Sequence, residues 1–252
     1  MKNQIILWLC AIIILFLIGY SKSITDKNYP VTGTFGIESN KVSYKLDKIS
    51  YGMIPYKNII ISDVKELEGI FIWEKDGEQK ETNYNVIDRG LVCEIPFGKP
   101  GLKINYKIIL KYRGKSYVIP EDDFITLTFW GNIPSSVNIL NFILLYGGLL
   151  MSIRCALELF NKNQNLKKYA VITCTFFIIL FSIVNPLRNS YKIGAINNYI
   201  PSIFDLFEPT LLLIVFCWIT GTILLFFKRY TMFVTIFIVF ITIFLFYLLP
   251  SA

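Results

Sequence analysis

Residues 124–153 read FITLTFWGNIPSSVNILNFILLYGGLLMSI, and within this stretch a strand-like segment gives way to a long apolar run. The apolar run, residues 137–153, is about long enough to cross a ~30 Å hydrocarbon core at 1.5 Å per residue. Four similar runs occupy residues 5–19, 169–187, 211–227 and 230–249. Because a bilayer offers no hydrogen bonds to the backbone, such non-alternating runs predict helices, not barrel strands. The sequence therefore predicts a membrane protein with about five transmembrane helices.

Basic residues predict how these helices are oriented. Segments on alternate sides of the spans are rich in lysine and arginine: Lys2 at the start, Arg154, Lys162, Lys167 and Lys168 after the second span, and Lys228 and Arg229 after the fourth. The loop between the third and fourth spans holds only Arg188 and Lys192, and the Ser251-Ala252 end holds no charged residue. Cytoplasmic loops carry the excess of positive charge. We therefore expect a multi-pass membrane protein with its N-terminus in the cytoplasm and its C-terminus outside.

The remaining sequence between the first and second spans is water-soluble and should lie outside the cytoplasm. Short strand-like runs fill it at 31–37, 42–49, 57–62, 69–75, 91–95, 102–112, 115–119 and 124–130. Gly and Pro separate these runs, and Asp76-Gly77 is a strong hairpin signal. This spacing predicts an all-β sandwich, immunoglobulin-like or fibronectin-like. The expected organisation is an N-terminal anchor or signal peptide at 1–20, the β-sandwich at 21–132 and a four-helix bundle at 133–252.

The first apolar run has two interpretations. Lys2, the apolar residues 5–18 and the small residues of Gly19-Tyr20-Ser21 resemble a secretory signal peptide with a weak cleavage site. The apolar part is long for a signal peptide, which favours an uncleaved anchor. Under either interpretation, the β-rich segment is exported.

Composition excludes several classes of function. The chain has a net charge of +7, but residues 21–131 hold 16 basic and 15 acidic residues, so the excess lies beside the spans. A basic, aromatic-rich patch for nucleic acid is not evident. The chain has no histidine, which excludes bis-histidine haem ligation, and only Cys93 of its five cysteines lies in the exported segment. No cofactor and no metal site is expected, and Glu121-Asp122-Asp123 lacks EF-hand spacing.

The apolar half contains few ionisable residues, and these are the candidate binding residues: Arg154, Glu158, Tyr191, Asp205 and Glu208. Arg154 and Glu158 are four residues apart and share one helix face. They form either an ion pair at the membrane surface or a charged pair inside the bundle that marks a pathway or docking site. Asp205 and Glu208 precede the fourth span, where Ser202 and Pro209 also fit a helix start. A long outer loop, residues 185–208, is predicted to pack on the β-domain.

Segments in the second half resemble a family of uncharacterised bacterial inner-membrane proteins with an exported β-domain and a C-terminal four-helix bundle. Ser152, Arg154, Leu157 and Glu158 match the family pattern S-x-R-x-G-L-E, apart from Ala156. The stretch from Pro186 through Tyr191, Gly194, Ala195 and Pro201 to Asp205 and Leu206 is similar to G-P…Y-A-F-G…W-T-G-x-P…D-L-T-D-N-K. Phe129, Gly131 and Pro134 resemble R-F-x-G-x-V-P, and Tyr247, Pro250 and Ser251 resemble an ending L-I-P-H-S.

The chain also departs from this family. Asn138 or Asn141, and Ser251, stand where the family has histidine, and Phe207-Glu208-Pro209-Thr210 replaces T-D-N-K. If those groups carry an activity, this member has lost or changed it. The resemblance implies the topology given above and no reaction.

Two main classes of function remain, and a third, weaker option is a sensor whose external ligand binding is read through the loop 162–168. The first is a non-enzymatic accessory or scaffold protein, anchored in the lipid bilayer, whose β-sandwich binds a ligand or another envelope protein. The second is a transporter of ions or small solutes, or a membrane-embedded enzyme, that uses the charged residues of the bundle. The last three spans have almost no ionisable residue at mid-depth, which favours the first class.

Overall fold

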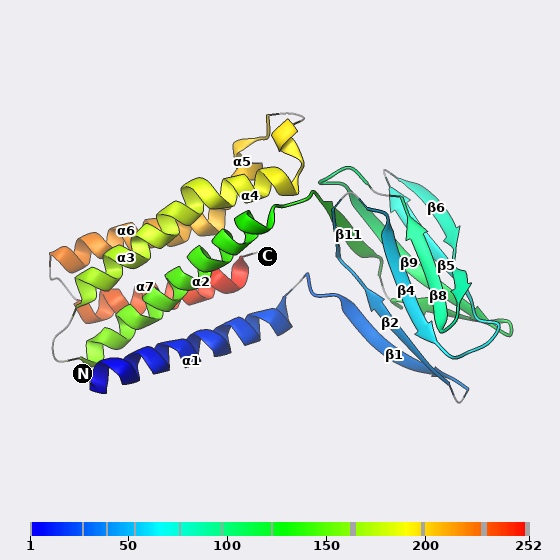
Figure 1. Ribbon diagram of the computed structural model, residues 1–252, viewed down its shortest axis with the longest axis horizontal. Helices are drawn as coiled ribbons and strands as arrows, with labels where there is room; N and C mark the ends of the chain where they lie inside the picture. Colours follow the sequence, from blue (N-terminus) through cyan, green and yellow to red (C-terminus); the bar gives the residue numbers. More distant parts are fainter. Residues whose placement is uncertain are drawn as a thin grey trace. The chain divides into compact units, whose positions relative to one another are not determined.

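The computed structural model describes the chain except residues 1, 27, 39, 53, 76, 97, 122, 162–164, 198–199, 228–230 and 250–252. Asp76, Asp122, Lys162, Tyr199, Lys228, Arg229 and the Ser251-Ala252 end, which the sequence analysis used, lie outside the described residues. The chain divides into a helical unit and a β unit. The helical unit comprises Met1–Lys27, Ile133–Tyr191 and Ala195–Ala252, and the β unit comprises Asn28–Asn132 and Lys192–Gly194 (Figure 1).

Five helices of the helical unit are long and apolar enough to cross a membrane: Gln4–Thr25, Ser135–Phe160, Leu166–Lys192, Pro209–Phe226 and Thr231–Leu248. Their regular segments are α1 (Lys2–Thr25), α2 (Ser135–Leu157), α3 (Leu166–Ile179), α4 (Asn185–Lys192), α6 (Pro209–Phe226) and α7 (Thr231–Leu248). A short helix, α5 (Ile203–Leu206), precedes α6. The sequence predicted all five runs, each at nearly its observed place.

The third of these helices is longer than predicted. A π-helical turn, Leu180–Val184, joins α3 to α4, so that the helix continues to Lys192. The expectation of a loop beginning at residue 185 is therefore wrong. The polar residues of 185–192 gave the sequence a loop-like composition, although a helix there can place them on one side and apolar residues on the other.

The helices pack closely where small residues meet large ones. Gly147 and Gly148 of α2 lie against the rings of Phe176 and Phe177 of α3, so any added Cβ would meet those rings. Between α6 and α7, Gly221 lies against Ile238. Small residues permit this approach in apolar helix bundles.

The β unit consists of two sheets. Its strands are β1 (Val31–Ile37), β2 (Asn40–Leu46), β3 (Ile49–Tyr51), β4 (Tyr56–Ser62), β5 (Glu68–Lys75), β6 (Glu78–Asn83), β7 (Asn85–Ile87), β8 (Gly90–Ile95), β9 (Lys103–Tyr112), β10 (Lys115–Ile119) and β11 (Ile125–Trp130). The first sheet has the order β1-β2-β4-β8-β7, and the second has the order β3-β11-β9-β5-β6, with β10 also paired to β9. All pairs are antiparallel except β3 with β11.

Two parts of this arrangement differ from the predicted strands. The expected strand 42–49 is two strands, because the chain leaves the first sheet after Leu46 and joins β11 of the second at Ile49. This change of sheet coincides with the end of the apolar–polar alternation. β6 and β7 were not predicted, because β6 reads EQKETN and is exposed along most of its length.

The core between the sheets contains polar groups that are paired with one another. The Asn58 side chain donates to the Lys45 carbonyl at 3.0 Å and accepts from the Tyr84 hydroxyl at 2.8 Å. The Tyr106 hydroxyl donates to the Asp47 carbonyl at 2.8 Å. Burial raises the pKa of both Tyr84 and Tyr106. Because the neutral phenols are hydrogen-bonded, this network holds the sheets together without an uncompensated buried polar group.

Candidate functional site

Arg154 and Glu158 lie together in the interior of the helical unit. Both side chains are 0% exposed, and Nη1 of Arg154 is 2.5 Å from Oε2 of Glu158. Arg154 belongs to the last turn of α2, and Glu158 begins a short 3-10 turn, Glu158–Phe160, that ends this helix. Of the two arrangements that the sequence left open, the structure has the interior one.

Other helices complete the surroundings of Arg154. Its Nη2 donates to the Gln4 side-chain carbonyl of α1. The guanidinium lies over the ring of Tyr169 of α3 at 4.7 Å, and over the ring of Trp8 of α1 at 5.5 Å. The two rings meet edge to face at 6.1 Å. We call Gln4, Trp8, Arg154, Glu158 and Tyr169 the Arg154 cluster. It joins α1, α2 and α3 around a buried ion pair.

Glu158 is bound just as closely on its other side. Its Oε1 accepts from the Asn161 side chain at 2.7 Å and from the backbone N–H of Asn165 at 3.1 Å. These bonds close the turn between α2 and α3 over the carboxylate. Within the described residues, Arg154 Nε and the nearby Ser152 hydroxyl are buried without a hydrogen-bond partner. Arg154 Nη1 and Glu158 Oε2 are also buried without a hydrogen bond, but these two atoms form the ion pair, so the two charges compensate each other.

The other predicted site residues are not brought to the Arg154 cluster. Asp205 is exposed in α5, where its backbone N–H and its carboxylate both pair with the Ser202 hydroxyl, at 3.2 and 2.7 Å. Glu208 caps α6 in front of Pro209 and accepts from the Thr210 hydroxyl at 3.4 Å. Tyr191 is half-buried in α4. Asp205 and Glu208 therefore have sufficient structural roles at helix starts.

A second polar group, which sequence analysis did not treat as a site, lies on α2 and α4. We call Asn138, Asn141, Asn185 and Arg188 the Asn–Arg cluster. Asn141, Asn185 and Arg188 are each less than 9% exposed, and Arg188 Nε donates to the Asn138 side chain at 3.1 Å. The spacing of three residues in Asn138/Asn141 and in Asn185/Arg188 places each pair on one helix face, and this was the available signal.

The antiparallel course of the helices brings Asn141 and Asn185 to the same level. Leu166 meets Cys155 near one end of the α2–α3 pair, and Arg188 meets Asn138 near the other. One turn inward from Asn138 is Asn141, and one turn inward from Arg188 is Asn185. Both side chains are buried, with Asn141 7% and Asn185 6% exposed. The π turn 180–184 ends directly before Asn185, and such turns are frequent at functional sites.

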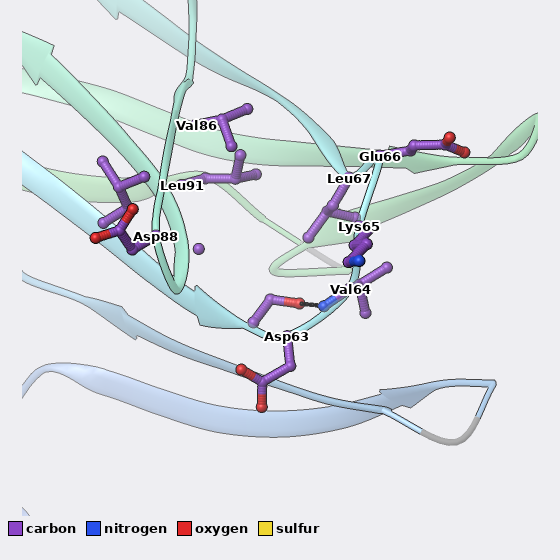
Figure 2. Close-up of a pocket in the computed structure, with 11 residues that line it drawn as sticks. Asp63, Val64, Lys65, Glu66, Leu67, Val86, Asp88 and Leu91 are labelled. Carbon is purple, nitrogen blue, oxygen red and sulfur yellow. Dashed lines mark hydrogen bonds between the residues drawn. The ribbon is translucent and has the colours of Figure 1, made fainter.

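The β unit has a surface pocket of about 320 Å³ between the β4–β5 connection and the β7–β8 hairpin. Leu67 and Leu91 form its apolar wall, and Asp63, Glu66 and Asp88 stand around it. Figure 2 shows the three carboxylates pointing away from one another, so they do not converge on a common ligand. The pocket therefore combines an apolar wall with dispersed charges, three carboxylates and the ammonium of Lys65.

Metal and thiol chemistry have little support. Among the described residues, no group of three or more His, Cys, Asp or Glu side chains is placed to hold a metal ion. All five cysteines are free, and Cys93 is 1% exposed in the core of the β unit. Burial raises the pKa of the Cys93 thiol to about 11. A thiol this protected is a poor nucleophile at neutral pH.

Comparisons of the chain with protein-family models, with curated proteins and with solved structures gave no match.

Proposed function

We propose that this chain is a multi-pass protein of the bacterial inner membrane that presents its β unit outside the cytoplasm as a binding module for a ligand or another envelope protein. In this proposal the helical unit is an anchor and docking element and carries no catalysis. The five apolar helices and the alternating basic residues beside them support the membrane placement. The N-terminus would be cytoplasmic, and the C-terminus would lie outside with the β unit.

The observation that carries the proposal is that the two units have separate cores. The β unit encloses its own set of buried side chains, among them Val42, Leu46, Phe71 and Leu127, all 0% exposed. The helical unit encloses another, around Leu149, Phe177 and Trp218. A soluble-type domain inserted between two apolar helices is suited to display at a membrane surface.

The strand order supports an immunoglobulin-like sandwich. The run β2-β4-β8-β7 corresponds to strands A-B-E-D, and β5, β9 and β11 correspond to C, F and G. The disulfide of antibody domains has no equivalent, since Cys93 is the single cysteine of this unit and lies on the E-like strand. Sandwiches of this kind bind through loops and edges, so the architecture is compatible with the proposal without naming a ligand.

The distribution of charge argues against a path through the bundle. α6 and α7 contain no Asp, Glu, Lys or Arg. The Arg154 and Glu158 charges face each other within a closed cluster, which suits a structural role in joining α1, α2 and α3. An ion or proton relay would need ionisable groups at successive depths.

The Asn–Arg cluster favours a second candidate, transport of a polar solute or catalysis inside the membrane. Buried polar side chains in membrane helices mark functional sites by default, and the π turn adds to this. Solute flux into proteoliposomes that is abolished by Asn141→Leu would favour this candidate. Solute flux equal to that of empty liposomes would contradict this candidate and would leave the binding protein as the proposed function.

The resemblance to the envelope family described from sequence is part of the same proposal. It rests on the quoted segments, of which Arg154 and Glu158 belong to the Arg154 cluster. It adds the expectation that relatives share the placement of the β unit.

Labelling with a membrane-impermeant thiol reagent tests the placement. Val86→Cys in the β unit should react in cells whose outer membrane alone is permeable, because Val86 is 79% exposed. Lys168→Cys, exposed at the start of α3, should react only after the inner membrane is broken. Both variants are made in a chain whose native cysteines are replaced. The opposite pattern would overturn the proposed orientation, and extraction of the chain by alkaline carbonate would overturn membrane insertion.

A further inference from the structure

The edges of the two sheets differ in how well they are protected. A free strand edge presents unpaired backbone groups to other chains, and proteins usually shorten such strands or place charges on them. In the first sheet β7 has three residues, and in the second sheet β3 has three. β6 carries Glu78, Lys80 and Glu81, and β10 carries Lys115. β1 reads VTGTFGI: it has seven residues, with no charge and no proline.

The outer side of β1 is open along the described strand. β1 pairs with β2 over its whole length, from Val31 opposite Leu46 to Ile37 opposite Asn40, and it ends the sheet on its other side. The close connection after Ile37 makes Ile37 and Asn40 a hydrogen-bonded pair. Alternation then directs the backbone N–H and C=O groups of Thr32, Thr34 and Gly36 away from β2. The side chains of both threonines are exposed.

We propose that β1 is a homodimer edge, to which a second copy of this chain adds its own β1 in antiparallel orientation. The two five-stranded sheets then form one continuous sheet. Pairing centred on Thr34 uses all seven residues of both strands, with each Thr34 opposite the other. Gly33 then lies opposite Phe35 of the second copy, and Thr32 lies opposite its Gly36.

The charge distribution selects a second copy as the occupant. A two-fold interface uses the same surface twice, so the surface must complement itself. β1 meets this condition because self-pairing places no like charges opposite each other, whereas such pairs destabilise a sheet. The two lysines of the adjacent strand, Lys41 opposite Gly36 and Lys45 opposite Thr32, lie one strand away from the proposed interface, and Lys45 is paired with Asp47 at 3.1 Å. The charged strand β6 would place Lys80 or a glutamate near its own copy and does not fit this geometry.

The inference rests in one respect on the proposed function. A single strand pair is a small contact, which would be weak between freely diffusing molecules. Two copies anchored in one membrane, with their β units on the same side, meet at a much higher effective concentration. Membrane anchoring thereby makes a modest edge contact sufficient for a dimer.

Introducing a charge of either sign at Thr34 tests the pairing in the full-length protein. Thr34→Lys and Thr34→Glu should each convert the dimer to a monomer in lipid nanodiscs, because like charges meet on the two-fold axis. Co-expression of the two variants under different tags should restore a mixed dimer. The exposed position allows both variants to fold. The same two changes at Val86 on the β7 edge serve as the matched control and should leave the dimer intact. A monomeric wild type, or dimers that persist in both single variants, would overturn the proposal.

Disulfide trapping tests the register. In a chain without native cysteines, Thr34→Cys should give a covalent dimer on mild oxidation. Thr32→Cys should not, because its two copies would be four residues, or about 14 Å, apart along the strands at ~3.4 Å per residue, beyond the reach of a disulfide. Equal trapping at both positions would indicate random collision and contradict the register. Alkaline carbonate extraction of the same membranes separates the two hypotheses: an inserted monomer contradicts the dimer alone, and an extracted chain contradicts the proposed function.

Discussion

At the scale of single residues, Arg154 and Glu158 show how a charge is kept inside an apolar bundle. The guanidinium has a carboxylate on one side, an amide from Gln4 on another, and two aromatic faces above it. Each contact lowers the cost of removing the charge from water. The arrangement depends on both charges being present, which gives a specific expectation for mutants.

Removing one charge of the pair should cost far more than removing both. Arg154→Met or Glu158→Gln leaves the other charge buried without its partner, and we expect each to lower stability by about 3–5 kcal/mol. The double variant should recover most of that loss. Thermal unfolding in mild detergent measures the difference.

A matched control for this pair lies on the β unit. Lys57→Ala breaks an exposed ion pair with Glu94, 2.7 Å long, and should change stability by less than about 1 kcal/mol. Equal and small effects for both single variants and the double variant would show that the Arg154 charge is solvated in the membrane.

Cys93 should respond to pH through its burial. Its pKa rises to about 11 in the folded protein, whereas the unfolded thiol ionises near its ordinary value of 9.0. The stabilisation is therefore complete below pH 9 and is lost as pH rises from 9 to 11. The buried tyrosines have raised pKa values and add to the loss at higher pH.

The comparison that isolates Cys93 uses a chain lacking the other four cysteines. The folded protein should react with a thiol reagent at pH 8 only as fast as it unfolds, whereas Val86→Cys should react at once. Cys93→Ala should flatten the fall of stability between pH 9 and 11. Rapid modification of Cys93 in the folded state would contradict its burial.

At the scale of elements, α1 contacts the rest of the helical unit near both of its ends. Gln4 and Trp8 contact Arg154. At the other end, Lys22 donates to the Tyr247 carbonyl in α7 at 3.3 Å and to the Leu249 carbonyl just after α7 at 2.5 Å. Positive charge at a helix C-terminus is favourable. Cleavage after Ser21 would remove Gln4 and Trp8 from the Arg154 cluster.

We therefore expect α1 to remain part of the mature protein, as an uncleaved anchor and not as a signal peptide. Intact-mass analysis of the purified membrane protein should include residues 4–21. Trp8→Ala should lower the unfolding temperature in detergent, whereas Phe16→Ala on the exposed side of α1 should not. A mature N-terminus at Lys22 would contradict this expectation.

The elements also show which features can be predicted from a sequence of this kind. Apolar runs and alternating strands depend on local composition, so residues 211–227 and 31–37 were placed within a few residues of α6 and β1. β6 was missed because an exposed edge strand needs no apolar residues. The π turn at 180–184 was missed because its residues read as an ordinary apolar helix. The pairing of Asn138 with Arg188 joins residues fifty positions apart and depends on helix packing, which no local pattern encodes.

At the scale of the whole molecule, each of the two units buries its own hydrophobic core. The β unit buries its aromatic and aliphatic side chains between its own sheets. At one edge the chain passes at Tyr84 from β6 of the second sheet to β7 of the first, and the Tyr84 hydroxyl donates to the Asn58 side chain in the core. Three residues at the end of α4 and directly after it, Lys192–Gly194, belong to this unit as well. The Lys192 carbonyl accepts from the Gly131 N–H at 2.8 Å, and its ammonium lies 3.7 Å from the Trp130 ring centre.

The β unit should therefore fold without the helices. A fragment of residues 28–132, exported to the periplasm and carrying Thr34→Lys to prevent edge pairing, should be soluble and unfold in one cooperative step, because its core is complete. The same fragment should be somewhat less stable than the unit within the full chain, since it lacks the cation–π contact from Lys192, worth about 0.5–1 kcal/mol. Lys192→Ala in the full chain should reproduce that difference. The contrary result is an unfolded fragment, with well-dispersed amide signals only in the full-length protein. It would show that the β unit needs the helical unit in order to fold. The proposal that the β unit is a displayed binding module would then lose its basis.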